Sequence, residues 1–203
     1  MVVTGIYYAL GLVAGGLIVS YLTRPVYGIP FYIVAAFCLY FFRDPDRTIP
    51  PGPVAVSPAD GKVMAVVPEG DDLTRISIFL NIFDVHVTRT PIAGTITSVV
   101  YRPGKFLIAS QEEASQQNEM NIITVEGEGT TVVYKQIAGL VARRVVCDKK
   151  PGDVVAKGER IGIIKFGSRM DVLLGPEWRI TVEEGQRVSA GSSILAERQD
   201  VQN

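Results

Sequence analysis

Residues 161–174 read Ile-Gly-Ile-Ile-Lys-Phe-Gly-Ser-Arg-Met-Asp-Val-Leu-Leu, and this stretch joins two apolar segments through a short polar break. The segments 161–164 and 170–174 have the length and composition of buried strands. Gly167-Ser168 lies in the break, where glycine accepts φ > 0 and serine hydrogen-bonds to nearby backbone. The dipeptide is typical of a turn, and the rest of the chain decides whether Ser168 can react with the peptide bond before it.

The sequence around this stretch consists of short β-branched segments separated by Gly, Pro and Asp turns. That pattern predicts a mainly β domain with little helix. The polar segment 109–117 is the best helical candidate and could equally be a loop. We expect further strands at residues 54–56, 63–67, 76–80, 95–101, 122–125, 131–135 and 141–146.

Residues 151–161 and 184–194 resemble each other in the placement of their glycines and valines. We interpret both as hairpins of a barrel-sandwich hybrid, the flattened β-fold of biotinyl and lipoyl carriers. This resemblance gives one alternative function, a membrane-anchored carrier or binding module without catalysis. A carrier presents a lysine at an exposed turn, usually between small or methionine residues, and Lys165 before Phe166 fits that requirement poorly.

The N-terminus contains two uncharged apolar segments, 5–22 and 29–42. A helix needs about 20 apolar residues to cross a bilayer, so the first segment is long enough and the second is short. We predict a membrane-associated helical hairpin over residues 1–42, in which Gly11 and Gly15 allow the helices to approach closely. Two buried helices of a soluble protein are the alternative, although such helices usually carry a polar stripe.

A charged, proline-rich linker at 43–53 separates this hairpin from a β-rich domain at 54–203. No Lys or Arg precedes Arg24, whereas a secretory signal peptide begins with basic residues. Arg43 and Arg47 follow the second apolar segment, and the positive-inside tendency therefore predicts a cell-membrane protein with its β domain on the cytoplasmic side.

The composition excludes several classes of function. The 203 residues carry 20 basic and 21 acidic side chains, and no basic stripe suggests a nucleic-acid partner. Cys38 and Cys147 form no disulfide framework, and with a single histidine they do not match the spacing of a zinc site, so we expect no metal. The strand edges of a β domain could pair with a second copy, which leaves a homo-oligomer open.

Two other side chains have the chemistry to assist Ser168. His86, the single histidine, lies between Asp84 and Arg89 and has an unperturbed pKa near neutrality. Asp60 lies in a tight Asp-Gly turn between two apolar strands. Each also has an ordinary structural interpretation, since lone histidines are often buried and Asp-Gly is a common turn. The serine-hydrolase elbow Gly-x-Ser-x-Gly is absent.

Five motifs in order carry a resemblance to a known family. Together they resemble the short form of the phosphatidylserine decarboxylase family, which includes archaeal archaetidylserine decarboxylases. The resemblance covers nearly the whole chain, hairpin included, and implies an enzyme that converts the serine headgroup of a diacyl or ether-linked phospholipid into ethanolamine. The motifs are Phe-Phe-Arg-Asp-Pro-Asp-Arg at 41–47, Ser-Pro-Ala-Asp-Gly at 57–61, Asp-Val-His at 84–86, Gln-Ile-Ala-Gly-Leu-Val-Ala-Arg-Arg at 136–144 and Phe-Gly-Ser-Arg at 166–169.

The resemblance implies a proenzyme that cleaves itself between Gly167 and Ser168, giving chains 1–167 and 168–203. Ser168 becomes a covalent pyruvoyl group, which forms a Schiff base with the lipid amine and serves as electron sink during decarboxylation. It also implies that His86 is the acid that protonates the product carbon. A second Gly-Ser pair, Gly191-Ser192, lacks the preceding apolar strand and Phe, so it is not the expected cleavage site.

Longer family members have a second histidine three residues after the first, where this chain has Arg89. Either His86 serves both self-cleavage and decarboxylation, or self-cleavage relies on Asp60 and backbone strain. Arg143, Arg144 and Arg169 are the candidates for binding the headgroup phosphate or carboxylate. Arginines at strand borders are nearly as often structural.

Overall fold

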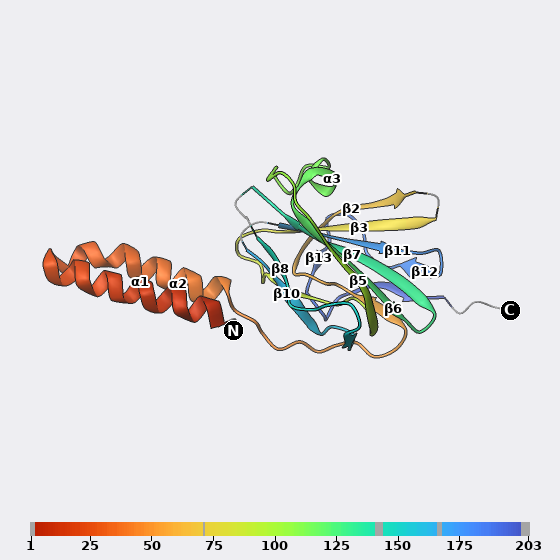
Figure 1. The fold of residues 1–203 in the computed structure, drawn as a ribbon, viewed down its shortest axis with the longest axis horizontal. Helices are drawn as coiled ribbons and strands as arrows, with labels where there is room; N and C mark the ends of the chain where they lie inside the picture. The colour runs from red at the N-terminus through yellow and green to blue at the C-terminus, as the bar shows by residue number, and fades with distance from the viewer. Residues whose placement is uncertain (1–2, 71, 141–143, 166–167, 200–203) are drawn as a thin grey trace. The chain divides into compact units, whose positions relative to one another are not determined.

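A computed structural model describes residues 3–70, 72–140, 144–165 and 168–199 (Figure 1). It divides into two compact units, Met1–Asp46 and Arg47–Asn203. The prediction of a mainly β protein with apolar helices at its N-terminus is confirmed.

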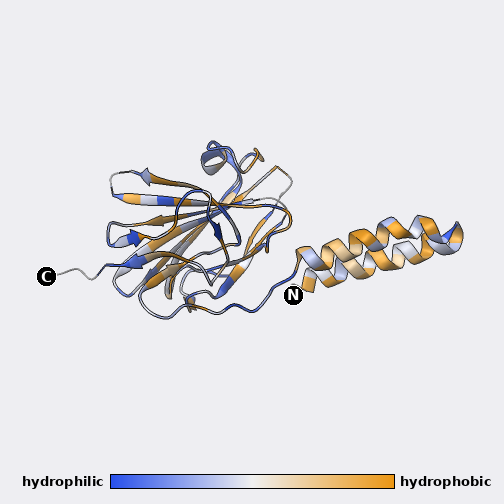
Figure 2. Cartoon of the chain, turned by 180° about the vertical axis from the view of Figure 1, so that it is seen from behind, coloured by the Kyte–Doolittle hydropathy of each residue, from blue (hydrophilic) through white to orange (hydrophobic). Residues whose placement is uncertain are grey.

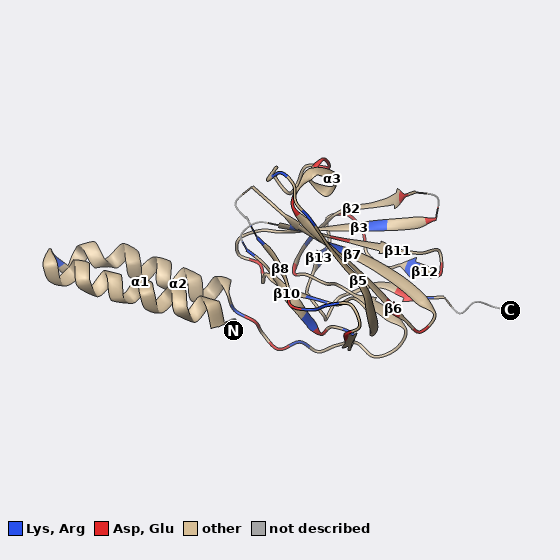
Figure 3. Ribbon diagram, viewed as in Figure 1, with Lys and Arg blue, Asp and Glu red and all other residues tan. Residues whose placement is uncertain are grey.

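The first unit is a pair of apolar helices, α1 (Val3–Leu22) and α2 (Ile29–Phe41), connected by a 3-10 turn at Pro25–Gly28. α1 is 20 residues long and apolar enough to cross a membrane, whereas α2 is shorter. Hydrophobic colouring runs along both helices in Figure 2, and charged colouring in Figure 3 is confined to the turn between them. Two helices without a polar stripe match the expected hairpin.

The two helices approach each other at Gly5 and Gly16. A Cβ on Gly5 would lie 2.4 Å from the Phe42 Cβ, and one on Gly16 would lie 2.7 Å from a tyrosine ring carbon. The expectation for Gly11 was wrong, because nothing lies within 4 Å of a Cβ built there. Since α1 is apolar all round, its sequence does not reveal which face meets α2.

The second unit contains antiparallel sheets. Within the described residues the largest sheet has eight strands in the order β13-β2-β3-β11-β7-β6-β5-β9, and two three-stranded sheets have the orders β1-β14-β12 and β4-β10-β8. The large sheet curls around the core in Figure 1. Its strands are β2 (Gly61–Glu69), β3 (Leu73–Leu80), β5 (Gly94–Arg102), β6 (Met120–Gly127), β7 (Thr130–Ala138), β9 (Val154–Val155), β11 (Ser168–Leu174) and β13 (Arg187–Val188); the smaller sheets contain β1 (Val54–Val56), β4 (Val87–Arg89), β8 (Val145–Cys147), β10 (Arg160–Ile164), β12 (Trp178–Ile180) and β14 (Ile194–Arg198).

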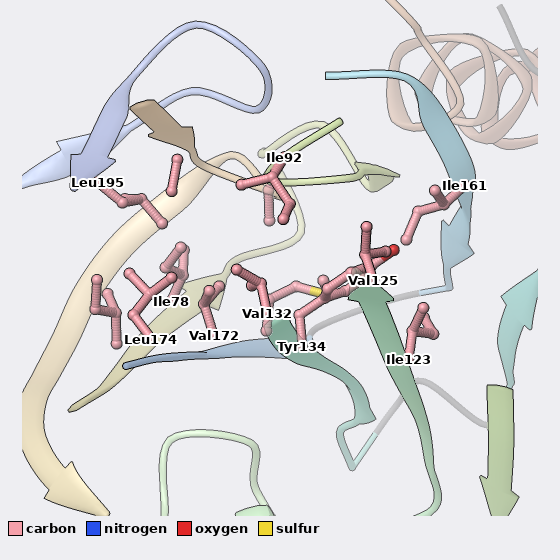
Figure 4. Close-up of a cluster of buried hydrophobic side chains, with 14 of the residues drawn as sticks. Ile78, Ile92, Ile123, Val125, Val132, Tyr134, Ile161, Val172, Leu174 and Leu195 are labelled. Carbon is pink, nitrogen blue, oxygen red and sulfur yellow. The ribbon is translucent and has the colours of Figure 1, made fainter. Parts of the chain in front are cut away.

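Side chains from all three sheets meet in one hydrophobic core (Figure 4). Alternate residues of a strand face the same side, so Met170, Val172 and Leu174 of β11 all enter this core. Figure 4 shows Leu174 beside Ile78 of β3 and Val172 near Val132 and Tyr134 of β7, with Ile161 of β10 and Leu195 of β14 at the edges of the same cluster.

The two similar segments do not form the hairpins that we expected. β9 pairs with β5 in the large sheet, and the strand after it, β10, pairs with β4 and β8. In the same way β13 pairs with β2, and β14 pairs with β1 and β12. Each segment therefore carries the chain from the large sheet to a small one. The similarity between the two sequences thus reflects two equivalent connections between sheets and not two hairpins. The expected helix is shorter than 109–117, because α3 covers only Ala114–Gln117.

Candidate active site

Ser168 is the first residue of β11, a central strand of the large sheet. It pairs with Leu80 of β3 on one side and Ala138 of β7 on the other, and it is fully buried. Its Oγ makes no hydrogen bond with any described residue. Leaving a buried hydroxyl unpaired costs about 1–3 kcal/mol, and such groups often have a chemical role. Gly167 and Phe166 lie outside the described residues.

The chain enters this site from β10, which belongs to a different sheet. The Ile164 N–H donates to the His86 carbonyl at 3.2 Å, and the Lys165 N–H donates to the Arg144 carbonyl at 3.3 Å. The end of β10 is thus held on both sides, two or three residues before the Gly167-Ser168 bond. These contacts bring His86 and Arg144 to the segment that leads into Ser168.

His86 is fully buried in the loop before β4, and its ring orientation is set by the backbone. Its Nδ1 lies 3.0 Å from the carbonyl oxygen of Asp84. A carbonyl only accepts hydrogen bonds, so the neutral imidazole carries its proton on Nδ1 and its lone pair on Nε2. Nε2 can therefore take a proton from a hydroxyl and return it later.

The loop that orients His86 is itself fixed. The carboxylate of Asp84 accepts a hydrogen bond from the Asn81 N–H at 2.9 Å and forms an ion pair with Arg187 of β13. Asp84 is only 5% exposed. Its role as the acceptor for His86 was not evident from the sequence, although the Asp-x-His spacing is a local signal for it.

Asp60 lies at a junction of loops. Its carboxylate accepts two hydrogen bonds from Arg47, at 2.8 and 2.9 Å, and one from the Ala190 N–H at 2.8 Å. Neither His86 nor Ser168 is among these partners. The carboxylate therefore joins the β1–β2 turn to the β13–β14 turn.

Arg89 lies three residues after His86, at the position where the family resemblance implies a second histidine in longer members. Its guanidinium donates to the Gly158 carbonyl at 2.9 Å, and its backbone N–H donates to the Pro58 carbonyl at 2.9 Å. The side chain is 6% exposed. Arg89 thus connects β4 to the loop that carries Asp60, and these contacts are structural.

Arg169 follows Ser168 but lies on the other face of the sheet. Its Nε donates to Asp171 at 2.6 Å, and its Nη2 donates to the Ser77 hydroxyl at 2.8 Å. Arg75 of β3 also donates to Ser77, at 2.8 Å. Arg169 is 2% exposed and its donors are used inside the protein, so it does not present its charge to a ligand in solvent.

Glu112, on the loop between β5 and β6, closes this ion-pair network. It pairs with Arg75 and, at 3.4 Å, with Arg169. Partial burial of the carboxyl opposes its ionisation, but the hydrogen bond from Arg75 and the charge of Arg169 outweigh this and lower the pKa of Glu112. The network was missed in the sequence, although Arg169 and Asp171 are two residues apart in a strand and must share a face.

The predicted headgroup arginines therefore occupy different environments. Arg144 is exposed beside the end of β10, whereas Arg169 is buried. Arg143 lies outside the described residues. Arg144 is the one of the three that the structure places at the surface next to the entry to Ser168.

Comparison with known proteins identifies the family of the chain. A family model described as phosphatidylserine decarboxylase matches residues 34–196. The chain is 70% identical over 200 residues to a phosphatidylserine decarboxylase proenzyme of Solibacter usitatus, covering 98% of both chains.

Two more distant relatives are also named phosphatidylserine decarboxylase proenzyme. The protein of Saccharopolyspora erythraea is 47% identical over 176 residues, covering 81% of this chain and 75% of the relative. That of Desulfotalea psychrophila is 43% identical over 176 residues, covering 82% of each. Since the family match extends over most of the sequence and the first relative is covered nearly end to end, the chain belongs to the phosphatidylserine decarboxylase family and is a decarboxylase.

Proposed function

We propose that the chain cleaves itself between Gly167 and Ser168 and then decarboxylates the serine headgroup of a glycerophospholipid, phosphatidylserine or archaetidylserine, to the ethanolamine lipid. The observation that carries this proposal is the Ser168 hydroxyl, buried without a hydrogen-bond partner among the described residues at the start of a central strand. The relatives are named proenzymes, which supports a maturation step.

Self-cleavage is an acyl shift followed by an elimination. The Ser168 Oγ gives its proton to a base and bonds to the carbonyl carbon of Gly167; the C–N bond breaks, and the nitrogen of Ser168 takes up a proton. Loss of the Ser168 Cα proton then expels the Gly167 carboxylate and leaves a carbon–carbon double bond. Water replaces the nitrogen, which leaves as ammonia, and residue 168 becomes a pyruvoyl group.

His86 is the base that the contacts favour for this step. A hydroxyl is a weak nucleophile at neutral pH and needs a nearby acceptor for its proton. The Nε2 lone pair of His86 is oriented by Asp84, and the His86 backbone holds the strand end before the scissile bond. The Asp60 carboxylate, by contrast, is bound by Arg47 and Ala190. We assign Asp60 the supporting role of holding its loop.

After cleavage, the new chain 168–203 stays in place without a covalent link. β11 pairs with β3 over seven residues and with β7 over six, and β13 and β14 pair with β2 and β1 of the larger chain. The hydrogen bond from Arg169 to the Ser77 hydroxyl, at 2.8 Å, and the ion pair of Asp171 with Arg75, at 3.8 Å, connect the start of this strand to β3. The residue that carries the cofactor therefore remains fixed between Leu80 and Ala138.

The buried position of residue 168 suits a pyruvoyl group, which would supply a carbonyl that binds the lipid amine and accepts the electron pair left on the α-carbon when carbon dioxide departs. His86 delivers a proton to the product carbon from Nε2, and Arg144, with Arg143, binds the headgroup phosphate. The apolar α1 and α2 keep the enzyme at the bilayer, and we place the β domain on the cytoplasmic side of the cell membrane.

Intact-mass spectrometry of the purified protein tests this proposal. We expect two chains, 1–167 and 168–203, with the smaller lacking a free amino terminus and reacting with phenylhydrazine. Decarboxylase activity in a preparation that contains only the uncut chain would overturn it. A membrane-anchored carrier, the alternative function, would remain a single chain without decarboxylase activity.

A further inference from the structure

Three connections leave the large sheet at the end where Ser168 lies. Ser168 is in register with Leu80 and Ala138, the last residues of β3 and β7. Arg102, the last residue of β5, belongs to the next row of the sheet through Met120 and Ile137. The connections after β3, β5 and β7 therefore surround the position of the reactive serine.

Each of these connections exposes large apolar side chains. Phe83 is 60% exposed and Leu140 is 58% exposed, and Ile82 and Ile108 are also exposed. Ile82 and Phe83 follow Leu80 by two and three residues, and Leu140 follows Ala138 by two. We call these four residues, Ile82, Phe83, Ile108 and Leu140, the apolar rim.

Side-chain hydrogen bonds of two asparagines hold parts of the apolar rim in place. The side chain of Asn118 donates to the carbonyl of Ala138 at 2.7 Å and to that of Leu107 at 2.9 Å, and it accepts from the Leu107 N–H at 2.8 Å. Asn118 is fully buried, so Ile108 is fixed next to the strand partner of Ser168. On the other side, Asn81 accepts from the Phe83 N–H at 2.8 Å.

Positive charge surrounds the apolar rim. Arg102, Lys105 and Arg144 are exposed and lie at the ends of, or within, the same connections. Of the three acidic residues on the β5–β6 connection, Glu112 is paired with Arg75, Glu119 is buried and accepts a hydrogen bond from the Val145 N–H at 3.4 Å, and Glu113 is exposed. Large exposed apolar groups bordered by cations are typical of surfaces that insert into an anionic bilayer interface.

We propose that the apolar rim inserts into the interface of a bilayer that contains anionic phospholipid, so that the β domain docks with the Ser168 end of its sheet facing the lipid. The inference rests on the proposed function for the identity of the substrate. It also connects docking to chemistry, because the residue after Phe83 is Asp84, whose carbonyl orients His86. A lipid headgroup would then reach residue 168 without leaving the bilayer surface.

Tryptophan quenching by lipid tests the docking without reference to catalysis. Phe83→Trp is compared with Val154→Trp in the full chain, reconstituted in vesicles of phosphatidylcholine and phosphatidylserine with or without brominated acyl chains. Val154 is 78% exposed and pairs with Thr95, seven residues along β5 from Arg102, or roughly 23 Å from the rim end of the sheet. The native Trp178 is buried and contributes the same background to both variants.

We expect brominated lipid to quench at least half of the emission added at position 83 and little of that added at position 154. Equal quenching at the two positions would overturn the proposal. So would a tryptophan at position 83 that iodide in the water quenches and brominated lipid does not. Protection from both quenchers would show that a protein partner or a second copy covers the rim, and that result would also reject bilayer docking.

A second measurement uses activity. Ile108→Ser should lower the ratio of turnover on phosphatidylserine vesicles to turnover on monomeric short-chain phosphatidylserine by about tenfold, and Val154→Ser should leave this ratio unchanged. An unchanged ratio for Ile108→Ser, together with no lipid quenching in the Phe83→Trp variant, rejects the docking surface. Loss of activity on both substrates in the parent protein would instead reject the proposed function, and the quenching result would still decide the docking.

Discussion

Ser168 and Arg169 are consecutive residues of β11 whose side chains lie on opposite faces of the large sheet. Ser168 shares a face with Met170 and the hydrophobic core, whereas Arg169 shares a face with Asp171 and bonds to it. Ser168 is thus followed at once by a buried ion pair. If the chain is cleaved as proposed, its new end begins one residue before Arg169, whose side chain is hydrogen-bonded to Ser77 of β3 and would keep the first residue in position.

Replacing Ser168 with alanine should abolish both self-cleavage and decarboxylation. The alanine has no oxygen to attack the Gly167 carbonyl and cannot become a ketone. Mass spectrometry should show one chain of 22.0 kDa, the mass of the whole protein. The matched control is Ser192→Ala, which changes the other Gly-Ser pair and should cleave and react like the parent. Cleavage of the Ser168→Ala protein would contradict the assignment.

Removing the Asp171 carboxylate should destabilise the β domain strongly. Asp171 is fully buried, with Arg169 at 2.6 Å and Arg75 at 3.8 Å, so Asp171→Ala leaves two buried guanidinium groups short of negative charge. Breaking such a buried pair typically costs about 3–5 kcal/mol. Thermal unfolding followed by circular dichroism should show a much lower midpoint.

The exposed pair between Arg179 and Glu197 provides the control for that measurement. Both side chains are largely in solvent, at 61% and 44% exposure, and exposed pairs contribute about 0–1 kcal/mol. Arg179→Ala should therefore shift the midpoint little. Similar shifts for the two variants would mean that the ion-pair network does not stabilise the fold.

The sequence predicted the strands because their signals are local. β-branched or apolar segments between turn residues located β3, β7 and β11, whereas the roles of Ser168 and His86 come from the family resemblance and stay predictions. The sequence did not predict the partners of Arg169 on other strands, because these partners depend on the register of β11 against β3 and β7. The alternation Arg169-x-Asp171 does show that the two charges share a face, and this signal could have suggested an ion pair.

The role of Asp60 was obscured for a similar reason. An Asp-Gly turn beside a catalytic motif suggests a proton acceptor, whereas its actual partners, Arg47 and Ala190, come from the linker and from a turn 130 residues later in the chain. Contacts between loops that are so far apart in sequence leave no periodic pattern. The same holds for Glu112, which reaches Arg75 from 37 residues away.

Substitution of His86 should impair both self-cleavage and decarboxylation, to different extents. His86→Ala removes the only imidazole, so cleavage should slow and the cleaved fraction should show at least a hundredfold lower turnover, the lower end of the usual contribution of a general acid or base. His86→Gln keeps much of the volume without the proton transfer and should behave similarly. Cleavage is measured by mass spectrometry over time, and turnover is normalised to the cleaved chain. Normal values for both steps in His86→Ala would exclude the proposed role.

Acid should loosen the part of the β5–β6 connection that Glu112 holds against the sheet. The pKa of Glu112 is lowered in the folded protein, because Arg75 and Arg169 outweigh the effect of burial. Its pairing therefore contributes fully above the unfolded value near 4.3 and is lost as pH falls through the lower folded value. Hydrogen exchange of amides at 108–118, corrected for intrinsic rates, should rise as the pH falls from about 5 to about 3. Glu112→Gln should show the faster exchange already at neutral pH, because the neutral amide lacks the charge that holds both arginines, whereas Glu113→Gln, on the exposed neighbour, should match the parent. If parent and Glu112→Gln exchange equally at neutral pH, the carboxylate does not hold this connection in place.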